Sequence, residues 1–205
     1  MANLIDLLQG QLSEGLLDQL SNQLGGTDKE QTQDAASGII SAMVSALAKN
    51  ASDPNGASAL ANALERDHDG SILDDIMGYA GGSAAKPEYT QDRMTNGAGI
   101  LKHVLGAKQG NMIEMISKMS GLANGQTGNL MTMLAPIVMG MLGKQKKQQN
   151  LDQGGLADIL SRSVQSQTNK RQEMGFIGKL LDQDGDGSIM DDLANLGMKF
   201  LRRRR

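Results

Sequence analysis

The sequence predicts an all-α protein built from two related helical lobes, each ending in a helix-loop-helix with an Asp/Gly loop. Apolar residues recur every three or four positions along most of the 205 residues, and no segment shows the alternation of a strand. Glycine pairs at 25–26 and 154–155 separate the periodic segments. A shift of 95 residues also places 39–49 over 134–144, and both segments are apolar and end in lysine. The chain therefore contains an internal repeat.

The first lobe covers residues 1–80. Its apolar spacing predicts helices at 4–12, 16–24 and 39–47. After them comes an altered Asp/Gly loop, residues 65–75. Residues 81–93 are the predicted linker, because they begin with the sequence Gly-Gly-Ser-Ala-Ala-Lys-Pro.

The second lobe covers residues 94–205. Apolar spacing predicts its helices at 100–105, 112–119, 130–142 and 189–200. The two Asp/Gly loops superpose only with a shift of 117 residues, so the second copy is longer, and an inserted helix at 155–168 would supply the extra residues. The stretch 130–142 is apolar but has only 13 residues, which is too short to cross a bilayer. It is therefore expected to be a buried helix, and no membrane span is expected in the chain.

The second Asp/Gly loop, residues 182–192, has the spacing of the front half of an EF-hand calcium loop. Three aspartates lie two residues apart, and a glycine occupies the sixth place, where such a loop bends sharply. Hard divalent cations prefer oxygen ligands, so we expect one calcium ion here, with magnesium as the alternative. The expected ligands are Asp182, Asp184, Asp186, the backbone carbonyl of Ser188, and Asp191 or Asp192 as the closing carboxylate.

This loop departs from the EF-hand in its second half. Leu193 stands at the twelfth place, where the EF-hand has a bidentate glutamate, and Met190 at the ninth place cannot hold a water. Without a metal, Asp191 would accept the backbone N–H of Ser188 in a capping box at the start of a helix. Both interpretations are open at this point.

The first Asp/Gly loop is a weaker metal candidate. Glu65 replaces the first aspartate, Arg66 supplies a cation, and His68 stands where the second loop has glycine. We expect calcium to bind here weakly or not at all, since the same carboxylates can start a helix without metal. The residues of this second candidate site are Glu65, Asp67, Asp69, Ser71, Asp74 and Asp75.

Charge is distributed unevenly along the chain. Residues 1–92 carry 4 basic and 14 acidic residues, whereas residues 93–151 carry 7 basic and 1 acidic. Either the two segments attract each other or their charges cover solvated faces. The chain ends in four arginines, which either bind the phosphates of a nucleic acid or stay solvated. These residues are Arg202, Arg203, Arg204 and Arg205.

Composition argues against several classes of function. Cysteine is absent, which excludes disulfides and a thiolate site and fits a cytoplasmic location; no secretory signal is expected. The two histidines, His68 and His103, belong to no catalytic motif, and no phosphate or dinucleotide loop occurs. We therefore expect no enzyme and no small-molecule substrate. Eight of the 14 methionines lie between Met94 and Met141, where they either fill the core or line a partner groove.

Three segments resemble the bacterial YidB-like family of domains of unknown function. They are 64–76, with the sequence Leu-Glu-Arg-Asp-His-Asp-Gly-Ser-Ile-Leu-Asp-Asp-Ile, 97–101, with Gly-Ala-Gly-Ile-Leu, and 134–138, with Leu-Ala-Pro-Ile-Val. The resemblance covers most of residues 24–143. It implies a helical, homeodomain-like fold in a bacterial protein and brings no established activity.

Together these patterns predict a non-enzymatic binding or scaffolding protein with a calcium-stabilised helix-loop-helix. A protein partner, or a second copy of the chain, is the expected ligand of such a protein. The alternative is a protein that associates with nucleic acid or the ribosome through its arginine tail.

Overall fold

The computed structural model describes residues 4–81 and 92–170, and these ranges contain helices and no strand. The predicted all-α class is therefore confirmed. The helices before the gap are α1 (Leu4–Gly10), α2 (Glu14–Gln23), α3 (Lys29–Asn50), α4 (Pro54–Arg66), the 3-10 helix η1 (Ser71–Asp75) and α5 (Ile76–Ala80). Those after it are α6 (Asp92–Thr95), α7 (Gly97–Leu105), the 3-10 helix η2 (Gly106–Lys108), α8 (Gln109–Ser120), α9 (Asn124–Gln148) and α10 (Gln153–Lys170).

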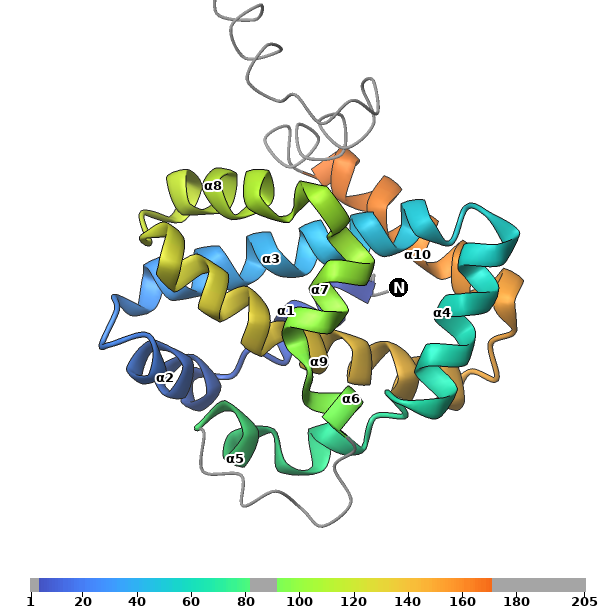
Figure 1. Cartoon of the computed structure of the whole chain (residues 1–205), viewed down its shortest axis with the longest axis horizontal. Coiled ribbons are helices and arrows are strands. Elements are labelled where there is room, and N and C mark those ends of the chain that lie inside the picture. The colour runs from blue at the N-terminus through green and yellow to red at the C-terminus, as the bar shows by residue number, and fades with distance from the viewer. Residues whose placement is uncertain (1–3, 82–91, 171–205) are drawn as a thin grey trace, which may run out of the picture.

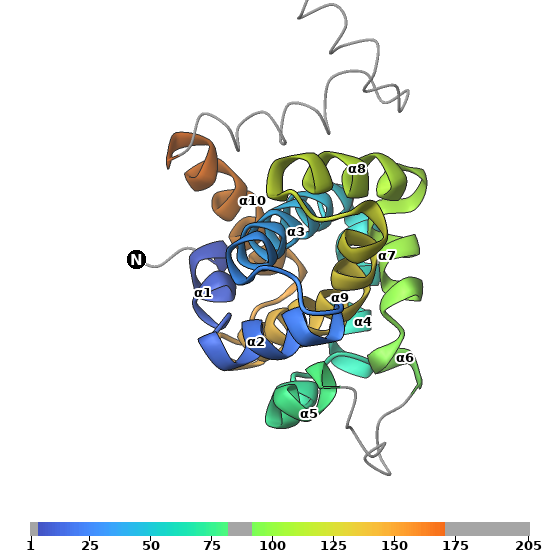
Figure 2. The ribbon, with the colours of Figure 1, turned by 90° about the vertical axis from the view of Figure 1, so that its left-hand side faces the viewer.

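The long helices α3 and α9 lie in the middle of the molecule, and the shorter helices surround them (Figures 1 and 2). α3 packs against α9 and also against α1, α2, α7, α8 and α10. Both long helices are buried almost all round near their centres, because their apolar residues do not keep to one stripe. The predicted buried helix at 130–142 lies within α9.

Local signals explain where the helices begin. Asp28 caps α3 by accepting a hydrogen bond from Gln31 N–H at 3.0 Å. Asp53 caps α4 through Asn55 N–H and Gly56 N–H, at 2.9 and 3.1 Å, and proline occupies the first turn. Apolar spacing alone did not predict α4, although this Asp-Pro start and the pair Leu60 and Leu64 mark it.

One hydrophobic core joins the two predicted lobes. Buried residues from α1 to α5 and from α7 to α10 belong to a single cluster, which includes Ile39 and Leu134 at its centre. Each of these two side chains is 0% exposed. The described parts of the two lobes, 4–80 and 94–170, are therefore packed together.

Helix α10 covers the range predicted as an inserted helix. Its N-cap Asp152 accepts a hydrogen bond from Gly155 N–H at 2.7 Å, as Asp53 does from Gly56 N–H in α4. α10 packs on α3, and α4 packs on α9. These parallels make α10, with 18 residues, the counterpart of α4, with 13 residues, so only part of the extra length of the second half follows α10.

Some predictions fall on residues that the structure does not describe. They are most of the linker, 82–91, and the final part of the chain, 171–205, which includes the predicted helix at 189–200. In the part of the chain that is described, no helix is long and apolar enough to cross a membrane.

Candidate functional site

The first Asp/Gly loop is held in shape by its own hydrogen bonds. Ser71 N–H donates to Asp69 Oδ1 at 3.0 Å, and Leu73 N–H donates to Gly70 O at 3.0 Å. Gly70 has φ +100°, a left-handed conformation that favours glycine. The chain then enters η1, and Asp75 Oδ1 accepts Gly78 N–H at 3.0 Å to cap α5. Asp69 and Asp75 therefore bind backbone amides.

This loop packs onto one face of α9 that carries two glycines. A Cβ atom placed on Gly143 would lie 1.7 Å from the backbone oxygen of His68, and one placed on Gly140 would lie 2.5 Å from Cγ2 of Ile72. Only glycine allows such close approach of the loop to the helix. We call Gly140 and Gly143 the glycine face of α9. The loop buries both of these residues.

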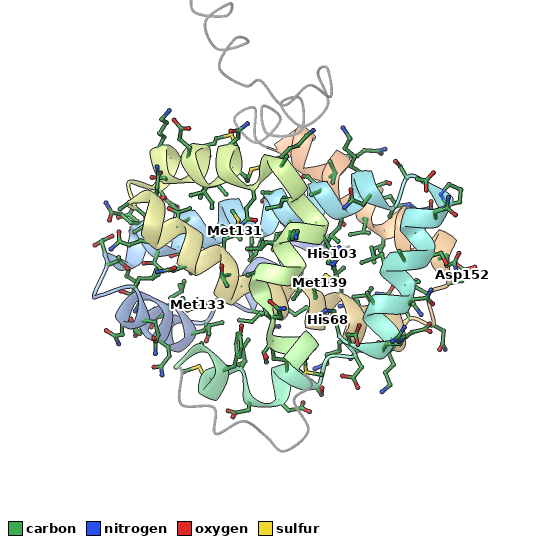
Figure 3. The ribbon with its side chains drawn as sticks, viewed as in Figure 1. His68, His103, Met131, Met133, Met139 and Asp152 are labelled. Carbon is green, nitrogen blue, oxygen red and sulfur yellow. The ribbon has the colours of Figure 1, made fainter. Side chains whose placement is uncertain are left out.

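His68 is the most unusual side chain of the loop. It is 5% exposed, and its Nδ1 atom has no hydrogen-bond partner. Burial lowers the pKa of His68 below its ordinary value, and the nearby charge of Asp67 opposes this effect. In Figure 3 His68 lies toward the middle of the molecule, whereas Asp152 lies at its rim. A neutral, buried histidine is a packing residue of this loop.

The C-terminal half of α9 brings lysines to the acidic loop. Lys146 Nζ forms an ion pair with Glu65 Oε1. The hydrogen bonds of Ser71 hold the pKa of Asp69 below its ordinary value, and the charge of Lys147 adds to this effect. The basic middle segment and the acidic first segment therefore meet at this loop. The predicted attraction between them is present at this contact, while other acidic residues, such as Glu30 and Asp34, are exposed.

The structure does not gather the six candidate ligands of the first loop around one centre. Among the described residues, no group of three or more histidine or acidic side chains could hold a metal ion. The reason is local, since Asp69 and Asp75 accept backbone amides while Glu65 pairs with a lysine. That calcium binds weakly or not at all at 65–75 stays a prediction.

The stronger candidates lie outside the described residues. They are the second Asp/Gly loop at 182–192, with its expected ligands, and the tail at 202–205. Among the methionines, Met112, Met131 and Met139 are buried and help to fill the core, whereas Met119 on α8 is 53% exposed. His103 is exposed on α7, away from the core.

The fold and this loop define a compact pair of helical repeats with an Asp/Gly turn seated on a central helix. The family model described as "Bacterial protein of unknown function (DUF937)" matches residues 6–145. The chain therefore belongs to this bacterial family. The match begins within α1, ends within the last turn of α9 and stops before α10 and the second Asp/Gly loop. The comparisons with curated proteins and with solved structures found no match, so the homeodomain-like character stays a prediction.

Proposed function

We propose that the protein is a non-enzymatic binding or scaffolding protein whose second Asp/Gly loop binds one calcium ion. The observation that carries the proposal is the set of three aspartates at alternate positions, followed by a glycine at the sixth place. In the proposed site Asp182, Asp184 and Asp186 supply side-chain oxygens, Ser188 supplies its backbone carbonyl, and Asp191 or Asp192 closes the coordination sphere.

The first loop supports this assignment by contrast. Its acidic groups meet Lys146, Lys147 and backbone amides. Residues 182–192 contain five aspartates and no basic residue, so like charges repel until a cation binds. The proposal includes a closer relationship to the YidB-like family, a cytoplasmic location, and a protein partner or a second copy of the chain as ligand.

Calorimetric titration with calcium tests the site. We expect one binding event, roughly micromolar or weaker because a bidentate glutamate is missing at the twelfth place. Asp184→Ala should weaken binding at least about tenfold, since it removes a charged ligand. Asp67→Ala, at the equivalent position of the first loop, is the matched control and should leave the titration unchanged. Equal heats from the wild type and Asp184→Ala would contradict the proposal. Repeating the calcium titration in the presence of magnesium shows which of the two cations the site prefers.

Calcium is proposed to act locally. The apolar residues on both sides of the loop, among them Phe176 and Phe200, can pack only if the chain reverses between them. A cation that binds the folded form preferentially stabilises it. Hydrogen exchange with and without calcium should show new protection mainly at 174–201. Comparable protection across 4–80 would indicate a global switch instead.

The alternative function is association with nucleic acid or the ribosome through the four C-terminal arginines. Each neutralised phosphate contributes about −0.9 to the slope of log affinity against log salt, so four arginines predict a slope of at most about −3 to −4. Ending the chain at Leu201 should abolish nucleic-acid retention, whereas replacing all four arginines with lysine should preserve most of it. Retention that survives the truncation would leave the tail as solvated charge.

A further inference from the structure

The two halves of the chain repeat one another in structure. α2 and α8 begin at Glu14 and Gln109, and α3 and α9 begin at Lys29 and Asn124, so both pairs are offset by 95 residues. This is the offset at which the two sequences align. Each position of α3 therefore corresponds to the position of α9 that lies 95 residues later in the chain.

Burial follows this equivalence closely. Along the central parts of α3 and α9, most equivalent positions have the same degree of burial; Thr32 and Thr127, for example, are both 0% exposed. Two positions are buried on α9 but partly exposed on α3. They are Ser45 and Ala48, the equivalents of the two residues of the glycine face. Among the described residues, then, this face of α3 lacks the cover that α9 has.

The cover on α9 is the first Asp/Gly loop. Ile72 lies against Gly140, and the backbone of His68 lies against Gly143. The chain contains a second copy of this segment. Residues 67–75 and 184–192 are identical at seven of nine positions, including the isoleucine that packs on the helix, Ile72 in the first copy and Ile189 in the second.

We propose that the second Asp/Gly loop docks on the face of α3 formed by Ser45 and Ala48, as the first loop docks on the glycine face of α9. The occupant of this surface is thus a segment of the same chain. Ile189 packs against Ser45, and the backbone at Gly185 lies over Ala48. The inference rests on the internal repeat and holds whether or not the loop binds calcium.

The small differences between the two faces suit this arrangement. Ser45 and Ala48 carry a Cβ where α9 has glycine, so the second loop sits farther from its helix than the first. Gly185 replaces His68, so the second loop has no bulky side chain to bury there. Eleven residues, 171–181, connect the end of α10 at Lys170 to the second loop, and an extended chain of this length spans up to about 36 Å.

Charge distinguishes the two docked loops. On α9, Lys146 pairs with Glu65 and Lys147 lies near Asp69. The chain positions that correspond to these lysines are Ala51 and Ser52, which follow Asn50, the last residue of α3. The second loop therefore docks with most of its carboxylates unneutralised by the helix beneath it.

A disulfide pair tests the docking in the full chain, which has no natural cysteine. Ser45→Cys with Ile189→Cys should form an intrachain disulfide under mild oxidation, because the equivalent atoms of Gly140 and Ile72 are adjacent. Gly125→Cys with Ile189→Cys is the control, since a Cβ at Gly125 meets no atom within 4 Å. The docked pair should oxidise at least about tenfold faster than the control, because docking raises the local thiol concentration.

Thiol labelling gives a second measurement that needs no cross-link. Ala48→Cys should react slowly with a thiol reagent, and adding Ile189→Asp should raise its rate about tenfold by releasing the loop. Circular dichroism checks that the helices remain.

Two results together would overturn the proposal. The two cysteine pairs would oxidise at equal rates, and Ile189→Asp would leave the labelling rate of Ala48→Cys unchanged. Disulfides formed only between chains would also overturn it, by making a second copy the occupant. Docking in calcium chelator as well as in calcium would uphold it even if the calcium titration failed.

Discussion

The buried His68 should make the stability of the protein depend on pH. The pKa of His68 is lowered in the folded protein, whereas in the unfolded chain it has its ordinary value near 6.5. At a pH between these two values, the unfolded chain therefore binds more protons than the folded protein. Stability should therefore fall as pH drops below about 6.5. His68→Leu should remove this loss, and it should cost little at pH 7.5 because the unpartnered Nδ1 is removed with the ring.

Urea denaturation at pH 7.5 and pH 5.0 measures this effect. His103→Gln is the control, because it replaces a histidine at an exposed position of α7. The prediction fails if the wild type and His68→Leu lose the same free energy of unfolding between the two pH values.

Gly143 is the second informative residue, because it lets the first loop approach α9. Gly143→Ala should destabilise the protein by about 2 kcal/mol or more, since the new methyl group would lie 1.7 Å from the His68 carbonyl oxygen and must displace the loop. Gly128 lies in the same helix, and the new Cβ atom of Gly128→Ala would lie 3.5 Å from Ile113 Cδ1, an ordinary van der Waals contact. It should stabilise by up to about 1 kcal/mol. Thermal melts measure the stability of both variants. Equal changes in stability would argue against close docking of the first loop on α9.

At the scale of the element, α4 and α10 begin with the same type of cap. Asp53 and Asp152 each accept backbone N–H groups of the first turn. Replacing either with alanine should cost about 1 kcal/mol, and the two losses should add because the caps share no partner. Asn in place of Asp should retain most of the stability. If both alanine variants lose less than about 0.3 kcal/mol of unfolding free energy, tertiary packing alone stabilises the first turns of α4 and α10.

At the scale of the whole molecule, the common core should make unfolding one cooperative event. Ile39 and Leu134 are equivalent positions of α3 and α9, and both are fully buried. Replacing either with alanine should lower the free energy of unfolding by about 2 to 5 kcal/mol. Because both belong to one core, each variant should shift the same single transition seen by calorimetry and by circular dichroism. Two transitions, each moved by only one of the variants, would mean that the lobes unfold independently.

The sequence by itself determined the class of the protein and the position of most helices. Apolar spacing of three and four residues is a local property, and it located α1, α2, α3, α7, α8 and α9. The difference between the two repeat offsets, and not apolar spacing, placed a helix at the position of α10. Local caps account for much of the rest, including the Asp-Pro start of α4. The Asp/Gly pattern also marked 65–75 as a turn before any packing was known.

Only the tertiary structure decided which faces meet. Nothing near Gly140 or Gly143 in the chain shows that His68 and Ile72, some 70 residues away, cover them. For the same reason the sequence left open whether the loop carboxylates bind metal, while the fold pairs Glu65 with Lys146 and directs Asp69 and Asp75 to backbone amides. Helix formation depends on neighbours along the chain, whereas packing and charge pairing depend on neighbours in space, and one repeat pattern is compatible with several such arrangements.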